Sequence, residues 1–415
     1  MTARPEASPQ QPPRAEARAP RALALPEFVA LMAMLTATVA FSIDAMLPAL
    51  PEIGRTLAPG SPNAAQLVIV GFVFGMGAGT LLVGPLSDAW GRRPVILGGA
   101  LLYGVGAALC TVAPTLETML AARVLQGIGA SGPRVASQAM IRDLYAGRDM
   151  ARVSSFVMMA FTLVPAIAPL IGAGIIAGFG WRGVFWAFVA FSALGAGWLM
   201  LRQPETLPPA LRRPLDLGRL RRAVAEVLGH ANVRRAIAMQ SLLFGLLYAT
   251  IASVQPIYEA TFDRAASFPV WFGAVSILAG GASFLNARLV GRLGMLWLLR
   301  RALTGHLALS VLLALAWVSG LLPEGPRFAL FVVWQVGTFS LAGLTLGNLN
   351  AIAMQPMGHI AGMAASVVSS VSTVVGVAVA APIGLAFDGT PVPLMAGGAL
   401  CAGSALWLAR RLREG

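Results

Sequence analysis

Apolar stretches, each long enough to cross a lipid bilayer, dominate this chain of 415 residues. A membrane-spanning helix needs about 20 predominantly apolar residues, and we find twelve candidates in succession. They cover residues 28–50, 65–87, 94–113, 118–141, 153–178, 183–201, 236–258, 268–290, 298–320, 327–352, 362–387 and 391–409. The sequence therefore predicts an all-α integral membrane protein with twelve transmembrane helices.

Composition excludes a soluble protein. Hydrophobic residues make up 57% of the chain and charged residues 11%, whereas charged residues make up about 25% of an average soluble domain. So few charges cannot hydrate the surface of a soluble fold of this size. The net charge of +13 would suit a nucleic-acid partner, but the arginines do not cluster on a soluble domain. We therefore expect the lipid bilayer as a partner and no nucleic acid.

The predicted spans divide six and six around a polar segment. Residues 1–26 lack apolar periodicity, which indicates a disordered cytoplasmic tail, and residues 27–201 hold the first bundle. The linker 202–235 is rich in Arg and Pro. It fits a surface helix lying on anionic headgroups, with a regulatory site as the alternative. Residues 236–409 hold the second bundle, and residues 410–415 form a short tail.

The arginines are distributed unevenly between the two sides of the predicted membrane. All 30 basic residues are arginine, and 24 of them lie on one side. The loops on the opposite side hold only Arg55, Arg182, Arg264 and Arg327. Cytoplasmic loops carry the excess of positive charge in membrane proteins. We therefore predict a multi-pass protein of the bacterial inner membrane with both termini in the cytoplasm.

The two halves of the chain contain similar short motifs at equivalent positions. The turn after the second span contains Asp88-x-x-Gly91, and the turn after the eighth contains Arg288-x-x-Gly291. Two six-helix halves related by duplication are typical of secondary transporters, whose halves rock around a central site. We therefore expect two pseudo-symmetric six-helix bundles.

The strongest local pattern is a candidate cytoplasmic gate formed by Gly84, Asp88, Gly91, Arg92 and Arg93. The glycines allow close helix approach and a sharp turn. Asp88 can pair with an arginine or face a helix N-terminus. Charges grouped in this way can form a latch that breaks when the two halves move apart. An ordinary positive-inside turn is the alternative.

Residues 84–94 read Gly-x-Leu-x-Asp-x-x-Gly-Arg-Arg-Pro and resemble the loop signature of the major facilitator superfamily. Residues 43–51, 139–145 and 350–356 resemble the Bcr/CflA drug:proton antiporters of that superfamily. The resemblance covers residues 28–409. It implies the major facilitator fold, alternating access, efflux of drugs such as chloramphenicol or bicyclomycin, and use of the proton-motive force without a cofactor.

The chain departs from the family pattern in two places. The fifth-helix antiporter motif Gly-Pro-x-x-Gly-Gly appears with alanine at its first and last positions, while Pro169 and Gly172 are retained. The family usually has Met-Tyr after the first-helix aspartate, where this chain has Ala45-Met46. The altered fifth-helix motif bears on the prediction of antiport. The replacement after the first-helix aspartate bears on the predicted range of substrates.

Asp44 lies inside the first predicted span. A charge at the bilayer centre costs about 2.5–3.5 kcal/mol on insertion scales, so a carboxyl group there is suited to taking up and releasing a proton. We predict that Asp44 couples transport to protons. A structural acid satisfied by a neighbour, or by backbone near Pro48, is the alternative.

The fourth predicted span carries a polar stripe. Arg123 and Arg134 are eleven residues apart and share one helix face, and Gln126 and Gln138 lie within about 60° of it. A polar stripe in a membrane helix must face protein or a cavity rather than lipid. We predict that these four residues line the substrate cavity. A structural tie from Arg123 to a carbonyl or loop is the alternative.

Helix geometry also predicts relative depth. Asp44 and Arg123 each lie about 8–9 Å from the outer ends of their spans, so we expect them to pair and to exchange partners when a proton binds. Arg134 lies about 16 Å further toward the cytoplasm. One aspartate and two arginines make the cavity net positive, which favours neutral or weakly anionic substrates over dications.

Phe41, Phe161, Asn286 and Asn350 complete the predicted substrate cavity. For the aromatic residues, packing or an interfacial position is the alternative. For the asparagines, hydrogen bonds between helices are the alternative.

The sequence contains no GxSxG, HExxH or Walker motif, so we expect no enzyme, no cofactor and no metal. We predict a monomeric, proton-coupled multidrug efflux transporter that exchanges small amphipathic compounds for protons. An exporter or importer of an endogenous metabolite with the same fold is the alternative. A channel is a weaker rival because repeated filter elements are missing.

Overall fold

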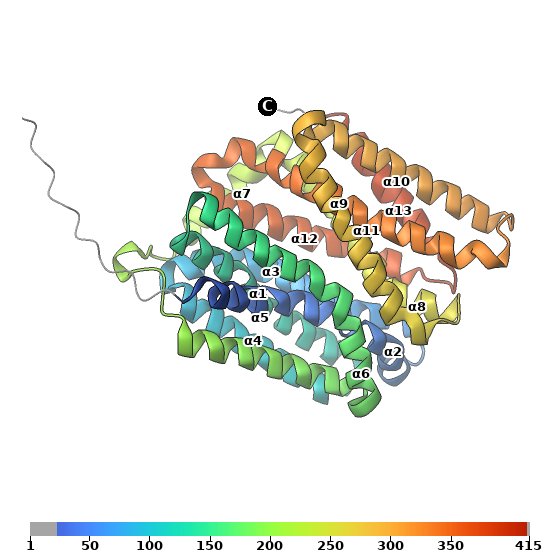
Figure 1. Cartoon of the computed structure of the whole chain (residues 1–415), viewed down its shortest axis with the longest axis horizontal. Helices are drawn as coiled ribbons and strands as arrows, with labels where there is room; N and C mark the ends of the chain where they lie inside the picture. Colours follow the sequence, from blue (N-terminus) through green and yellow to red (C-terminus); the bar gives the residue numbers. More distant parts are fainter. Residues whose placement is uncertain (1–22, 413–415) are drawn as a thin grey trace, which may run out of the picture.

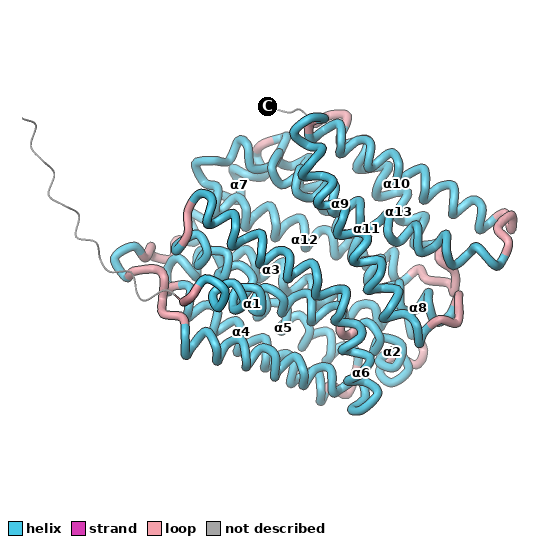
Figure 2. Tube along the Cα trace, in the orientation of Figure 1, coloured by secondary structure: helices cyan, strands magenta, loops and turns pink. Residues whose placement is uncertain are grey.

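The computed structural model describes residues 23–412, except for the side chains of residues 160–162. Within this range every regular element is a helix, and loops join the helices (Figure 2). Most of the predicted N-terminal tail falls outside the described residues.

The first half of the chain forms α1 to α6. Their bounds are α1 (Leu25–Asp44), α2 (Leu50–Leu57), α3 (Leu67–Trp90), α4 (Arg92–Val112), α5 (Leu116–Leu144) and α6 (Gly147–Arg202). α1 ends at Asp44, and a 3-10 turn over Leu47–Ala49 leads into α2. α6 turns at Gly180, whose φ of 65° and ψ of 179° interrupt the helix. It therefore contains two membrane passes.

The second half of the chain follows a linker that contains one helix, α7 (Leu217–Gly229). The remaining helices are α8 (Ala231–Ala260), α9 (Phe268–Leu293), α10 (Met295–Val318), α11 (Glu324–Met354), α12 (Ala361–Leu385) and α13 (Val392–Ala409).

Nine stretches of the described chain are long and apolar enough to cross a membrane. Two of them hold two passes each. These are α6 and the stretch Glu324–Leu385, in which the 3-10 turn Gln355–Ile360 joins α11 to α12. α5 supplies a further pass of 29 residues that includes Arg123 and Arg134. The described residues therefore contain the twelve spans predicted from the sequence.

The helices of each half pack mainly among themselves. α1, α3, α4, α5 and α6 contact one another in the first half, and α8 to α13 do so in the second. Figure 1 shows the two groups, coloured blue to green and gold to red. Between the halves, α3 packs against α12 and α6 packs against α9. This is the expected pair of six-helix bundles.

Equivalent turns in the two halves show the pseudo-symmetry. Gly91 joins α3 to α4 with φ 105° and ψ 161°, and Gly294 joins α9 to α10 with φ 81° and ψ 153°. Only glycine adopts this backbone region readily. The structural counterpart of Gly91 is thus Gly294. Gly291, which the sequence echo aligned with Gly91, lies inside α9.

Glycines bring α3 and α5 into close contact. A Cβ on Gly127 would overlap the carbonyl of Phe72, and a Cβ on Gly75 would overlap the carbonyl of Val124. Small residues let the backbones of membrane helices approach in this way. The contact holds Arg123, the neighbour of Val124, directly against α3.

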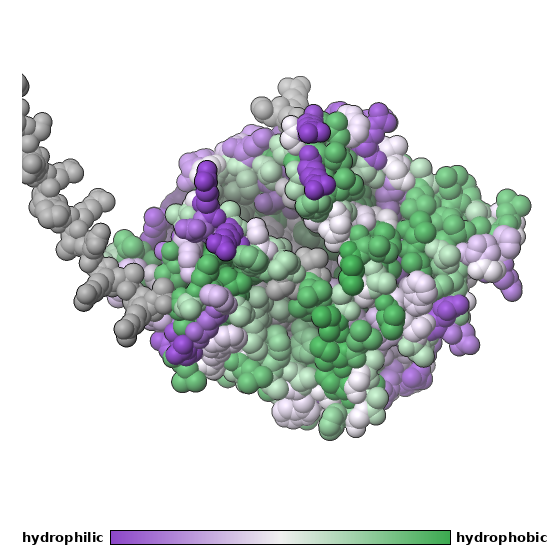
Figure 3. Space-filling model, viewed as in Figure 1, coloured by the Kyte–Doolittle hydropathy of each residue, from purple (hydrophilic) through white to green (hydrophobic). Residues whose placement is uncertain are grey.

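Large apolar side chains cover much of the outer surface. Leu101, Leu201 and Leu312 are each at least 65% exposed, and Figure 3 shows apolar surface over much of the visible face. Soluble monomers rarely expose contiguous apolar patches beyond a few hundred Å². The chain is a multi-pass membrane protein.

The linker between the halves is attached to the bundles through α7. This helix buries Leu220, Ala223 and Val227 and packs on α8 and α12. Asp216 caps its N-terminus, where Oδ1 accepts a hydrogen bond from the backbone N–H of Arg219 at 2.9 Å. This bond lowers the pKa of the Asp216 carboxyl group below its usual value. We call the end of the molecule that carries the α3–α4 turn and this linker the arginine-rich face.

Candidate functional site

A cavity of about 370 Å³ lies between the two bundles. Residues of α1, α3, α5 and α6 line it from the first half, and residues of α8, α9 and α11 line it from the second. Its wall is mostly apolar and aromatic. Among the described lining residues, only Asp44 and Arg134 are charged.

The cavity is closed at the end opposite the arginine-rich face. There α6 meets α9, and a Cβ on Gly273 would lie only 2.6 Å from the carbonyl oxygen of Ala166. Asn63 Nδ2 donates a hydrogen bond to the Phe387 carbonyl at 2.6 Å. Ser253 Oγ donates to Gln66 Oε1 at 2.9 Å.

A third polar contact at this end is the ion pair between Arg55 and Glu259, at 3.4 Å. Toward the arginine-rich face α6 and α9 spread apart (Figure 1), and a hollow lies between them on the surface (Figure 3). The structure is therefore a conformation in which the cavity opens toward the arginine-rich face.

Asp44 lies where α1 breaks, and its side chain is 4% exposed. Within the described residues its carboxylate makes no ion pair or hydrogen bond. An unpaired carboxylate in an apolar wall is costly while charged. Proton uptake removes this cost, which is the chemistry that proton coupling requires.

The fifth-helix motif supports the break in α1. Gly172 packs against the backbone directly after Asp44, and a Cβ on Gly172 would overlap the carbonyl of Ala45. Pro169 is buried one turn earlier in α6. The two retained motif residues therefore lie beside the proposed proton site, although no residue of the motif carries a charge.

Arg134 is half-buried on α5 and shares the cavity wall with Asp44 and Tyr248. No carboxylate in residues 23–412 lies within ion-pair distance of its guanidinium group. The structure thus brings Asp44 together with Arg134 in one cavity. Neither charged group has a fixed charged partner among the described residues.

Arg123 occupies a different environment. It is fully buried, and its guanidinium group donates hydrogen bonds to the Val68 carbonyl at 3.0 Å, the Ser42 carbonyl at 3.2 Å and Gln126 Oε1 at 2.7 Å. It also lies 4.4 Å from the centre of the Phe72 ring. In this conformation Arg123 holds α5 against α1 and α3 while Gln126 binds it from the same helix, and the predicted pair between Asp44 and Arg123 is not formed.

The other predicted cavity residues whose side chains the structure describes do not line this cavity. Phe41 packs against Phe188 and Phe191, with ring centres 5.3 and 5.0 Å apart. Asn348 Nδ2 donates to Asn286 Oδ1 at 2.8 Å, which joins α11 to α9. Gln138 is half-buried and Asn350 is exposed, while the side chain of Phe161 lies outside the described residues.

Sequence reasoning missed several lining residues on α9. Phe272, Ser276, Ala279 and Ser283 all line the cavity. Their spacing of four, three and four residues places them on one helix face. That periodicity was visible in the sequence, but without a charge on this face it resembles ordinary helix packing.

The candidate gate lies at the arginine-rich face. Arg92 is 8% exposed and forms ion pairs with Asp88 and, at 2.9 Å, with Asp143. Its guanidinium group also donates to Ser87 Oγ at 3.1 Å. Arg93 donates to the Met200 carbonyl at 2.6 Å. Of the predicted gate residues, Asp88 and Arg92 thus form a charge network with Asp143, and Gly84 faces Ser366 of α12 across the boundary between the halves.

Glu205 in the linker completes this network. Its carboxylate accepts hydrogen bonds from the backbone N–H groups of Arg92 and Arg93 at 3.0 and 3.1 Å. It therefore caps α4 at its N-terminus, where negative charge is favourable. Thr206 Oγ1 donates to Asp143 at 3.0 Å. Sequence reasoning missed Glu205 because its distance from Arg92 along the chain hides the contact.

A cavity between two related bundles, closed at one end, defines a secondary transporter. The profile of the Major Facilitator Superfamily matches residues 31–410, and the chain belongs to that superfamily. It is a transporter rather than an enzyme, and like the superfamily's other secondary transporters it needs no cofactor.

Relatives with similar sequences support the branch of the superfamily that the motifs resemble. The chain is 29% identical to the MFS-type transporter YdgK of Bacillus subtilis, over 88% of this chain and 90% of the relative. It is 29% identical to the bicyclomycin resistance protein homolog of Haemophilus influenzae, over 84% and 86%. It is 39% identical to the chloramphenicol resistance protein of Pseudomonas aeruginosa, over 40% and 39%.

Solved structures confirm the fold. The crystal structure of a D-xylose-proton symporter matches with a TM-score of 0.71 and 16% identity, over 93% of this chain and 98% of the other. The nucleoside transporter NupG matches with a TM-score of 0.71 and 14% identity, over 94% and 98%. At these identities the likeness shows the fold alone.

Proposed function

We propose that this protein is a proton-coupled efflux transporter of small amphipathic compounds in the bacterial inner membrane. The observation that carries the proposal is Asp44, a buried carboxylate in the wall of the central cavity without a fixed partner among the residues that the structure describes. The names of the relatives support drug efflux.

We further propose that the arginine-rich face and both termini are cytoplasmic, because positive charge accumulates in cytoplasmic loops. Residues 27–201 and 236–409 would then rock about the cavity as two bodies joined by the linker 202–235. The protein would act as a monomer, since one chain encloses the whole cavity.

In this mechanism Asp44 releases its proton to the cytoplasm while the cavity is open to that side. Substrate then enters the apolar cavity, and the halves rock to open the opposite end. Protonation of Asp44 from outside removes its charge, favours release of the substrate and allows the return. The step moves one proton inward for each substrate moved outward.

The cavity also supports a substrate class. The charges of Asp44 and Arg134 balance when substrate enters, and protonation of Asp44 leaves Arg134 as the remaining charge among the described lining residues, so at neither stage does the cavity carry the net negative charge that would favour cations. The aromatic and aliphatic wall favours apolar groups. We infer neutral or weakly anionic amphipathic substrates, similar to chloramphenicol or bicyclomycin. Export or import of an endogenous metabolite of the same character is the alternative.

The test uses everted membrane vesicles with an acidified interior. Addition of chloramphenicol, or of another neutral amphiphile from a small panel, should release protons from vesicles with the wild-type protein. Asp44→Asn should abolish this release, and Asp44→Glu should retain part of it. Asp263→Asn serves as the matched control because Asp263 lies in the loop after α8 and does not line the cavity.

Two outcomes would contradict the proposal. If folded wild-type protein releases no protons with any compound of the panel, drug antiport is wrong and the metabolite carrier becomes the better proposal. If Asp44→Asn retains full release, Asp44 does not couple transport to protons.

A further inference from the structure

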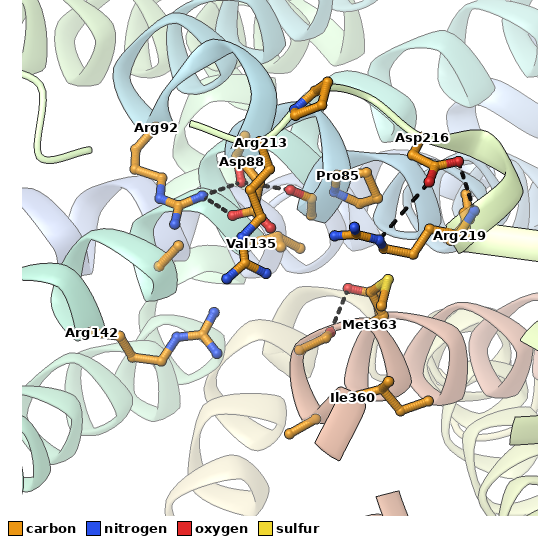
Figure 4. A pocket seen from close by; sticks show the side chains of 18 of the residues that line it. Pro85, Asp88, Arg92, Val135, Arg142, Arg213, Asp216, Arg219, Ile360 and Met363 are labelled. Carbon is orange, nitrogen blue, oxygen red and sulfur yellow. Dashed lines mark hydrogen bonds and ion pairs between the residues drawn. The ribbon is translucent and has the colours of Figure 1, made fainter. Parts of the chain in front are cut away.

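A second cavity lies at the arginine-rich face, apart from the transport cavity. Its volume is about 240 Å³. Residues of α3, the start of α4, α5, the linker, α7, the 3-10 turn Gln355–Ile360 and the start of α12 line it, and Figure 4 shows it from close by. Four arginines and two aspartates contribute to the lining, so positive charge is in excess.

Ion pairs balance only part of this charge. Arg92 pairs with Asp88 and with an aspartate of α5. Asp216 lies 4.0 Å from the guanidinium group of Arg219. Both lining aspartates are therefore already engaged by these two arginines.

The other two arginines remain uncompensated. Arg142 follows the last buried turn of α5, and Arg213 lies in the linker before α7; neither forms an ion pair with any residue that the structure describes. Figure 4 shows their guanidinium groups pointing toward each other. The backbone N–H of Arg213 donates to the Asp88 carbonyl at 3.0 Å, which fixes this part of the linker.

Two guanidinium groups that converge without a counter-charge repel each other. An anion between them is attracted by both, so the arrangement becomes favourable. The planar fork of arginine matches the oxygens of a phosphate group and binds them with two parallel hydrogen bonds. A water molecule occupies about 30 Å³ in the liquid. The cavity therefore has room for one phosphate group and several waters.

We propose that Arg142 and Arg213 bind a phosphate group in this cavity. The group belongs either to a soluble phosphate or to the headgroup of an anionic phospholipid. The site is independent of the transported substrate, because none of the charged residues of the transport cavity contributes to it.

A bound phosphate also has a consequence for the gate. It joins α5 to the same linker whose Glu205 caps α4 and whose Thr206 binds Asp143. Occupancy therefore holds the linker against the gate turn, and transport slows when the site is filled.

The first arm of the test uses the purified full-length protein in a neutral detergent at low ionic strength. Equilibrium dialysis with radiolabelled inorganic phosphate should show one saturable site. The double variant Arg142→Gln/Arg213→Gln should weaken binding at least tenfold. The control Arg292→Gln/Arg301→Gln removes the same charge from exposed positions of α9 and α10 and should change binding less than twofold.

The second arm separates the two sources of phosphate. Native mass spectrometry of protein extracted from vesicles of phosphatidylglycerol and phosphatidylcholine should show retained phosphatidylglycerol if the headgroup is the ligand. The Arg142→Gln/Arg213→Gln variant should lose it and the control should keep it. Dialysis binding without lipid retention assigns the soluble phosphate instead.

The gel-filtration profile and helical circular dichroism of both variants establish that they are folded. The proposal is overturned if both double variants lose binding equally, because the effect is then one of net charge. It is also overturned if the wild-type protein binds neither probe saturably.

Discussion

The α3–α4 and α9–α10 turns have similar backbone conformations but differ in the ion pairs around them. Each passes through one glycine in a conformation that other residues rarely adopt. Arg92 follows the glycine of the first turn, and Met295 follows that of the second. Arg92 binds two aspartates, whereas no ion pair within the described residues involves the second turn. The pseudo-symmetry preserves shape, while only the first turn has the charges of a latch.

The largest expected difference between the two turns is in proton release after an arginine is removed from each. Arg92→Ala leaves Asp88 and Asp143 without their partner, at a cost of about 1–3 kcal/mol for lost charged hydrogen bonds. We expect proton release in the everted-vesicle assay to fall at least tenfold. Arg292→Ala, in the last turn of α9, removes an exposed arginine and should change release less than twofold. Equal losses in the two variants would contradict a latch confined to the first turn.

A smaller difference should separate Gly91→Ala from Gly294→Ala. Each forces alanine into an unfavourable backbone region, at a cost of about 1–3 kcal/mol. At Gly91 the new Cβ would also overlap the carboxylate of Glu205, the linker residue that caps α4. Thermal unfolding in detergent should therefore show the larger decrease in Tm for Gly91→Ala.

The double variant Gly91→Ala/Glu205→Ala checks the cause of that difference. Relative to Glu205→Ala alone, adding Gly91→Ala should lower the Tm no more than Gly294→Ala lowers it in the wild-type protein. A persistent excess would show that the Glu205 contact is not the reason.

The smallest effect concerns the linker, which supplies Glu205 to the first turn and has no counterpart at the second. The pKa of Asp216 is lowered in the folded protein by its bond to the Arg219 N–H. The cap therefore stabilises α7 above the unfolded pKa of about 3.9, and this stabilisation is lost as pH falls through the lower folded value.

Hydrogen-exchange protection of the first α7 amides, corrected for intrinsic rates, should decrease from about pH 6 to about pH 3. In Asp216→Asn the protection should be independent of pH over the same range, because an amide cap does not titrate. A wild-type profile as flat as that of the variant would exclude the carboxylate as the cap.

Most of the fold could be predicted from the sequence because each span leaves a local apolar signal. The break at Gly180 falls in the predicted gap between residues 178 and 183. The end of α1 at Asp44 could not be predicted, since the support comes from Gly172, more than a hundred residues away. Packing between distant segments leaves no local pattern.

The candidate site was predictable in its residue types rather than in its contacts. The sequence predicted that Asp44, Arg123 and Arg134 are charged residues within the membrane spans and have functional roles. It could not show that Arg123 bonds to the carbonyls of Ser42 and Val68, because every residue carries a carbonyl. The group that a buried charge binds can therefore be identified only from the three-dimensional structure.

The contacts that close the far end of the cavity set an energy scale for turnover. Two are neutral hydrogen bonds, from Asn63 and Ser253, and one is the ion pair of Arg55 with Glu259. Such contacts contribute roughly 1–4 kcal/mol together. A single proton moving down a potential of about 100 mV releases about 2.3 kcal/mol. Because the two quantities are comparable, one proton in the proposed cycle supplies energy on the same scale as the polar contacts that break and re-form at this end in each turnover.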